Sequence, residues 1–186
     1  PEGVLFDSGK YNIKDNSPAA VTAKALAEGL ARVLPCSVMD EAGVPFKPQE
    51  KCKRSMYHNK NMAFVEAIFL EGHTDNIQIT RSLPGAPLLT SNLKLSARRS
   101  ANTFEEIIFH VPSLMQFHGP ISSGNRPILA VSAYGETRPI ASNITRETRA
   151  SNRRIDLRIL MHKPGDVESF GRLRKEADIS AVISNP

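Results

Sequence analysis

The sequence predicts an α+β fold, a β-α-β-α-β-β sheet with helices packed on one face. Short apolar runs bounded by turn residues are typical of strands, and they alternate with two segments of helical periodicity, each about 18 residues long. Helices of that length between strands imply crossover connections, which place the helices over a sheet. Of the 186 residues, 40% are hydrophobic, which is enough to build a substantial core.

The chain begins with a predicted strand followed by a helix. The segment VLFDSG, residues 4–9, combines strand-forming residues with a turn. Ser17 is a suitable helix N-cap, and Pro18 occupies the first turn, where its missing N–H costs nothing. Apolar residues then recur at helical spacing as far as Leu34. Pro35 ends this helix, because proline cannot continue the hydrogen-bond pattern.

Residues 36–61 are rich in Pro, Lys, Gly and Asn, and we interpret them as an insertion rather than as a second domain. The two cysteines, Cys36 and Cys52, belong to no CxxC motif or Cys/His cluster that would recruit zinc. A disulfide between them would close a loop of about 15 residues and stabilise the fold by about 3 kcal/mol. It would require an oxidising compartment such as a periplasm. Two unrelated thiols are the alternative.

Three further segments complete the predicted order. FVEAIFLEG at 64–72 and PILAVSAYG at 127–135 are apolar on both faces, which indicates central strands. RRIDLRILM at 153–161 alternates apolar and charged residues, as a half-exposed strand does. The expected domain therefore spans residues 1–163. The charged tail that follows, 164–186, has no predicted structure.

The second helix is expected in NLKLSARRSANTFEEIIFHV. At helical spacing, Leu93, Ala97 and Ile107 belong to one apolar stripe that should face the core. Asn92 and Arg99 lie off that stripe and within about 20° of each other. These two polar side chains are therefore placed to act together.

His73, Thr74 and Asp75 follow the central strand, and three interpretations compete for them. They could turn the chain with local hydrogen bonds. They could serve metal or acid/base chemistry, but the other histidines are scattered, and no HExxH motif, paired carboxylates or nucleophile elbow appears. We therefore predict no enzyme, metal or cofactor. They could form a binding site in which Asp75 and Arg99 hold the two charges of a zwitterion.

Four blocks occur along the chain in a particular order: LFDSG at 5–9, EGHTDNIQI at 71–79, SNLKLSARRSA at 91–101 and YGETRPIASNITRETRASNRRIDL at 134–157. With them the chain resembles the OmpA-like peptidoglycan-binding domain, and within that family the version found in MotB-type stator proteins. The blocks span nearly the whole domain up to Met161. The resemblance implies the same strand and helix order, and non-covalent binding of the diaminopimelate-containing stem peptide of the bacterial cell wall.

The resemblance also implies roles for five residues. In such domains the Asp of the HTD motif takes the ammonium group of the ligand, and the Arg of the LSxxRA helix clamps its carboxylate. These positions are Asp75 and Arg99. Asn92, Thr74 and Arg153 match positions that imply supporting contacts.

Two departures from the family pattern leave open which arginine of this helix contacts the ligand. Ser100 replaces the usual alanine after Arg99, and a second arginine, Arg98, precedes it. Either could face the ligand, although the shared phase with Asn92 favours Arg99. Arg153 and Arg154 should point to opposite faces of a strand, so only one of them is expected at the site.

The resemblance implies an anchor for a membrane complex. We expect a periplasmic domain of an inner-membrane-anchored protein with a membrane-embedded motor partner, in an ion-driven stator or in a Zorya-type anti-phage system. An outer-membrane or lipoprotein anchor of the same family is the alternative. A single site of this kind should bind with roughly micromolar to millimolar affinity, so firm anchoring predicts a homodimer on the repeating polymer.

The net charge of +5 attracts anions and raises a rival function, a basic nucleic-acid-binding domain. Five arginines near the end of the chain would support it. Against it, aromatic residues make up only 6% of the chain, tryptophan is absent, and no RNP, zinc-finger or helix-turn-helix motif appears. We therefore expect no nucleic acid partner. The arginines concerned are residues 146, 149, 153, 154 and 158.

Overall fold

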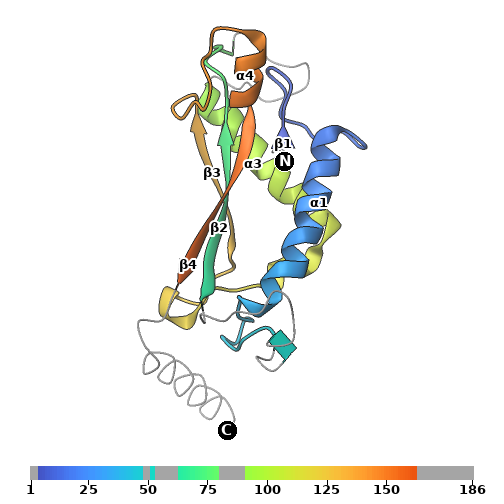
Figure 1. The fold of residues 1–186 in the computed structure, drawn as a ribbon, viewed down its shortest axis with the longest axis vertical. Helices are drawn as coiled ribbons and strands as arrows, with labels where there is room; N and C mark the ends of the chain where they lie inside the picture. The colour runs from blue at the N-terminus through green and yellow to red at the C-terminus, as the bar shows by residue number, and fades with distance from the viewer. Residues whose placement is uncertain (1–3, 48–50, 53–62, 80–90, 163–186) are drawn as a thin grey trace. The chain divides into compact units, whose positions relative to one another are not determined.

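The computed structural model describes residues 4–47, 51–52, 63–79 and 91–162 (Figure 1). It confirms the α+β class and adds one short helix, α4, between the last two strands. None of the helices in these ranges is long and apolar enough to span a membrane. The elements are β1 (Val4–Leu5), α1 (Pro18–Val33), η1 (Leu34–Cys36), β2 (Phe64–His73), α3 (Asn92–His110), η2 (Pro112–Gln116), η3 (Ile121–Ser123), β3 (Leu129–Gly135), α4 (Arg146–Asn152) and β4 (Arg154–His162).

The four strands form one sheet in the order β1-β4-β2-β3, and β1 pairs antiparallel with β4. Figure 1 shows α1 and α3 on one side of the strands, as predicted. Strand β2 is central, which confirms that prediction. Strand β3 lies at an edge, so its prediction as a central strand was wrong. Its apolar character reflects packing against α3, and a covered face does not reveal how many neighbours a strand has.

Helix α1 begins and ends where the sequence predicts. The side-chain oxygen of Ser17 accepts a hydrogen bond of 3.2 Å from the backbone N–H of Ala20, and Pro18 is the first helical residue. The helix ends at Val33, and Pro35 lies in the 3-10 turn that follows. Local sequence signals are therefore sufficient to position this helix.

The face of α3 that packs on the sheet is polar, so the predicted apolar stripe was wrong. Leu93 is 55% exposed and Ala97 is also exposed, whereas Ile107 is buried as expected. Apart from Leu95 and Ile107, the buried residues of the helix are polar. These polar residues are Asn92, Ser96, Arg99, Ser100 and Thr103.

Close approach between helix and strands explains this polar face. A Cβ atom added at Gly72 on β2 would overlap the carbonyl oxygen of Ser96 and the hydroxyl of Ser100. Only small side chains fit there, and their hydroxyls satisfy backbone groups of β3. Ser100 Oγ donates to the carbonyl of Ser132 at 2.8 Å, and Ser96 Oγ accepts from the N–H of Gly135 at 2.9 Å.

The chain divides into two compact units, and every predicted binding residue lies in the first. In the second unit, the predicted disulfide between Cys36 and Cys52 is confirmed, with a Cα–Cα distance of 5.7 Å. Part of the 36–61 insertion, and the tail from residue 163 onward, lie outside the described residues. The first unit comprises Pro1–Glu28, Phe69–Pro112 and Leu129–Arg158, and the second comprises Gly29–Ile68, Ser113–Ile128 and Ile159–Pro186.

Candidate ligand-binding site

A cavity of about 270 Å³ lies in the first unit, beside the end of β2. Three parts of the chain that are distant in sequence line it. They are residues 8–10 after β1, residues 75 and 77–79 after β2, and Leu95 and Arg99 on α3, joined by Arg153 at the end of α4. Three of the five binding residues expected from the sequence, at positions 75, 99 and 153, thus meet at one cavity.

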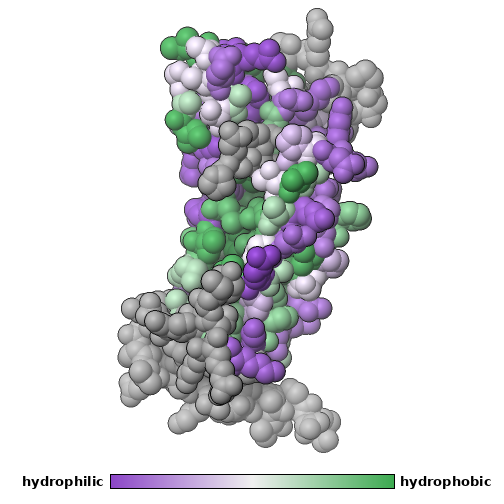
Figure 2. Space-filling model, turned by 45° about the vertical axis from the view of Figure 1, so that its right-hand side comes forward, coloured by the Kyte–Doolittle hydropathy of each residue, from purple (hydrophilic) through white to green (hydrophobic). Residues whose placement is uncertain are grey.

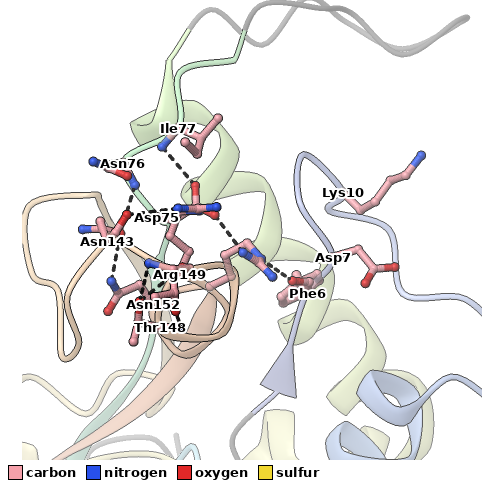
Figure 3. Close-up of polar contacts among 12 residues, drawn as sticks. Phe6, Asp7, Lys10, Asp75, Asn76, Ile77, Asn143, Thr148, Arg149 and Asn152 are labelled. Carbon is pink, nitrogen blue, oxygen red and sulfur yellow. Dashed lines mark hydrogen bonds and ion pairs between the residues drawn. The ribbon is translucent and has the colours of Figure 1, made fainter.

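Asp75 is held by contacts to both of its carboxylate oxygens. Oδ2 accepts a hydrogen bond from Arg153 Nη1 at 2.8 Å, which is also an ion pair, and Oδ1 accepts from the backbone N–H of Ile77 at 3.1 Å. In Figure 3 one dashed line joins this carboxylate to Ile77, and a second runs from it toward Phe6. The side chain is 7% exposed, so the pair is largely shielded from water and is worth more than a surface ion pair.

Arg99 borders the cavity, but its exposed fraction is 0%. All three guanidinium nitrogens donate to backbone carbonyls, namely Nε to Lys10 at 2.8 Å, Nη1 to His73 at 3.2 Å and Nη2 to Asp7 at 2.9 Å. The Phe6 ring lies beneath, with its centroid 5.0 Å from the guanidinium carbon. Arg99 therefore ties the segment after β1 to the end of β2.

Of the two neighbouring arginines on α3, the structure turns only one toward the cavity. Arg98 is exposed, and its guanidinium carbon lies 6.0 Å from the Tyr11 ring centroid. Burial, followed by the positive charge of Arg153, lowers the pKa of Arg99 to about 9, while Asp75 and Asp7 oppose the shift. At neutral pH the Arg99 guanidinium is still charged.

Arg153 and Arg154 point to different partners, as strand alternation predicts. Arg153 Nε donates to the carbonyl of Phe6 at 2.9 Å, while its Nη1 bonds Asp75, so its side chain spans from β1 to the cavity. Arg154 pairs with Asp156, with Nη2 and Oδ2 2.7 Å apart. Only the first of the two borders the cavity.

Thr74 and Asn92 are buried beside the cavity but do not line it. Asn92 Nδ2 donates to the backbone carbonyl of Asp75 at 3.2 Å, and the N–H of Thr74 donates to the carbonyl of Gly135 at 2.9 Å. Both residues thus fix the backbone around Asp75. Their predicted supporting contacts with a ligand stay a prediction.

The sequence analysis did not identify Asn152, the buried last residue of α4. Its Oδ1 accepts from the N–H groups of Ile140 and Ala141 at 2.9 and 3.0 Å. Its Nδ2 donates to the carbonyl of Ala141 and to Asn143 Oδ1, both at 2.9 Å. Because Asn143 Oδ1 also accepts from the N–H of Asn76, at 3.4 Å, this amide connects the loop before α4 to the residue after Asp75 (Figure 3).

Helix α4 was also missed, and its start did carry a local signal. It has only seven residues and no apolar periodicity. Thr145 caps it, and the side chain of Thr148 bonds back to the cap, which makes a capping box. The pattern usually has Glu or Gln at the second position, so a threonine there was not recognised as a helix start.

Electrostatics make the cavity suitable for an anionic group. Its lining contains three cations, Lys10, Arg99 and Arg153, and one anion, Asp75, which is a net charge of +2. Figure 2 shows that the surface around α4, at the upper end of both views, is mostly hydrophilic with isolated apolar residues. The arrangement can therefore hold a carboxylate with an ammonium group beside it.

The side chain of His73 does not line the cavity. Its buried ring stacks on Tyr134, with centroids 5.4 Å apart, and Nε2 lies 3.2 Å from Asp156 Oδ2. No group of three or more potential metal ligands occurs within the described ranges. Burial first, and then Arg154, lower the pKa of His73 below its usual 6.5, although Asp156 and Glu71 oppose this shift.

We predict that His73 makes the fold less stable in acid. Its pKa is lower in the folded than in the unfolded chain, so below pH 6.5 the unfolded chain takes up the proton first and gains stability. Urea midpoints measured between pH 7.5 and 5.5 should fall less steeply for His73→Phe than for the wild type. Identical slopes for the two proteins would disprove the assignment.

Comparison with known proteins identifies the fold. No protein-family model matches the chain. Motility protein B of Bacillus subtilis (strain 168) is 34% identical over 93 residues, which are 50% of this chain and 30% of that protein. The crystallised C-terminal domain of Helicobacter pylori MotB is 18% identical, with coverage of 97% of this chain and 98% of that chain and a TM-score of 0.51.

A second structure, of the periplasmic domain of Helicobacter pylori MotB, is 17% identical with a TM-score of 0.50, and the match covers 95% of this chain and 87% of that one. At such identities, the two structural matches speak for the fold alone. The 93 residues shared with Motility protein B add a sequence relationship over half of the chain. The chain thus has the fold of the C-terminal domain of MotB, and it shares sequence with Motility protein B over half of its length.

Proposed function

We propose that this domain binds bacterial peptidoglycan non-covalently and thereby anchors a membrane protein complex to the cell wall. The observation that carries the proposal is the cavity where Asp75 meets Arg99 and Arg153. The free end of diaminopimelate in the stem peptide bears an ammonium and a carboxylate on one carbon. Asp75 is the acceptor for the ammonium, and a guanidinium is the donor for the carboxylate.

The chemistry of the lining suits this ligand. A guanidinium donates two parallel hydrogen bonds to a carboxylate, which a lysine ammonium cannot do. A hydrogen bond to a charged group contributes about 1.5–3 kcal/mol, whereas an exposed ion pair contributes about 0–1 kcal/mol. The shielding of Asp75 and both arginines therefore supports specific recognition over a diffuse attraction of charges.

The relatives suggest the setting in which the domain works. One is named Motility protein B, and another is the periplasmic domain of MotB. We propose a periplasmic domain of an inner-membrane-anchored, homodimeric stator subunit that works with a membrane-embedded motor partner. A Zorya-type anti-phage system is the alternative assembly, and both assemblies would bind the cell wall through the same site.

The nucleic-acid alternative loses most of its basis in the structure. Arg153, Arg154 and Arg158 pair with Asp75, Asp156 and Glu71. Arg149 donates to the carbonyls of Asn143 and Ile144. Four of the five arginines that could contact phosphate are therefore used within the fold, which favours the cell-wall ligand.

Retention on purified peptidoglycan sacculi tests the function. We expect the wild type to sediment with sacculi and Asp75→Asn to lose at least about 90% of this retention, because the substitution removes the charge that takes the ammonium. The exposed Asp15→Asn, which makes the same chemical change, should bind like the wild type. Binding to oligonucleotides with a steep salt dependence, without retention on sacculi, would instead support the nucleic-acid function.

A further inference from the structure

We propose that Lys10 and Arg98 form a second contact for the ligand at the edge of the cavity, and that this contact takes a second carboxylate of the same stem peptide. The inference rests on the proposed function and extends it. The diaminopimelate head group is matched by Asp75 and by the guanidinium groups that line the cavity. The stem peptide carries further carboxylates, one on the glutamate before diaminopimelate and one at its C-terminus.

Two contacts bring Lys10 and Arg98 to neighbouring positions. The carbonyl of Lys10 accepts a hydrogen bond of 2.8 Å from Nε of Arg99, which places Lys10 against α3 at the residue after Arg98. The guanidinium carbon of Arg98 lies 6.0 Å from the ring centroid of Tyr11, the residue after Lys10. Lys10 itself lines the cavity. The two cations therefore lie on adjoining segments at its edge.

Both cations remain available to a ligand. Lys10 and Arg98 are exposed, and within the described ranges their charged groups make no hydrogen bond or ion pair. The backbone of Lys10 is nevertheless fixed, because its N–H donates to the carbonyl of Asp7 at 3.1 Å and its carbonyl accepts from Arg99. In Figure 3 the Lys10 side chain points away from Asp75, so its ammonium is placed for a group other than the one that Asp75 binds.

Charge favours an anion at this position. Lys10 and Arg98 carry two positive charges, and Asp7, the acidic residue of the same turn, forms no ion pair with either in the described part of the chain. Exposed ion pairs are weak and are screened by salt, so each contact should strengthen binding by no more than about fivefold. The second carboxylate is kept nearby by the bound head group, so it need not be captured from solution. Amidation of that carboxylate should therefore weaken binding by about three- to tenfold.

Isothermal titration at low salt with three stem tetrapeptides tests the contact. One peptide has all its carboxylates free, one is amidated at glutamate and one is amidated at the C-terminus, so the experiment also identifies which carboxylate is bound. The wild type should bind one of the two amidated peptides about three- to tenfold more weakly than the free peptide. The double variant Lys10→Gln with Arg98→Gln should bind all three equally. The control Lys14→Gln makes the same charge change at an exposed residue outside the cavity lining and should keep the preference of the wild type.

The outcomes separate this contact from the proposed function. Equal affinity of the wild type for the three peptides, or survival of the preference in the double variant, overturns the contact. An equal loss of the preference in Lys14→Gln also overturns it, because the attraction would then be diffuse. Retention on sacculi without binding of any of the three peptides overturns the contact but leaves the proposed function intact. Absence of both peptide binding and retention on sacculi overturns the proposed function itself.

Discussion

Replacing Arg99 with methionine should lower the free energy of unfolding by about 2–3 kcal/mol. Methionine fills much of the same space but removes the donors of the Lys10 and His73 carbonyls and one of the two donors of the Asp7 carbonyl, which also accepts from the Lys10 N–H at 3.1 Å. A buried carbonyl such as that of His73 costs about 1–3 kcal/mol when it loses its partner, whereas Asp7 and Lys10 are exposed and water relieves part of their cost. The loss would lie at the upper end of the range of most single substitutions, about 0.5–3 kcal/mol.

Urea unfolding of Arg99→Met and of its exposed neighbour Arg98→Met gives a matched comparison. The control should change stability by less than about 0.5 kcal/mol, because its side chain is exposed. A loss below 1 kcal/mol in Arg99→Met would show that the three carbonyls find other partners. The structural role assigned to this arginine would then be wrong.

Introducing a single methyl group at Gly72 should also destabilise the domain strongly. In Gly72→Ala the Cβ would overlap the hydroxyl of Ser100 and the carbonyl of Ser96, with 2.9 Å to the carbonyl carbon. Backbone atoms cannot move aside as a flexible side chain can, so α3 must shift away from β2. Overpacking of this kind costs about 1–3 kcal/mol or more, and it would separate the two elements that carry Arg99 and Asp75.

The matched control, Gly29→Ala, is expected to change the stability in the opposite direction. Gly29 lies within α1, and a Cβ built there meets nothing within 4 Å. Gly29→Ala should therefore stabilise the helix by about 0.5–1 kcal/mol. Thermal unfolding should move the melting temperatures of the two variants in opposite directions. A Gly72→Ala protein that melts with the wild type would mean that helix and strand pack less closely than described.

Several features of the fold follow from sequence because their causes are local. Ser17, Pro18 and Pro35 mark α1 through capping and backbone restriction, which do not depend on the rest of the chain. The apolar run of β2 indicates burial on both faces, and β2 is central. The pairing of Cys36 with Cys52 follows because the chain contains no other cysteine.

The candidate site was predictable only in part. The resemblance to a family singled out Asp75, Arg99 and Arg153 as binding residues, and all three line one cavity. Asn152 was missed because a buried amide looks like any other polar residue until its partners are known. Its four hydrogen bonds join segments that the sequence shows only as a polar, turn-rich stretch.

By itself, the sequence determined the fold class, the boundaries of α1 and the central place of β2, and it predicted the disulfide and three of the residues that line the cavity. Only the tertiary structure decided which face of α3 packs on the sheet, that β3 is an edge strand, and that Arg99 lines the cavity as a fully buried residue while Arg153 pairs with Asp75 there. The features determined by the sequence depend on the spacing of hydrophobic residues, on the backbone restriction imposed by proline and on residue type. The features decided by the tertiary structure depend on how closely α3 approaches the sheet and on which backbone groups each polar side chain hydrogen-bonds. Such contacts exist only once distant segments have packed together.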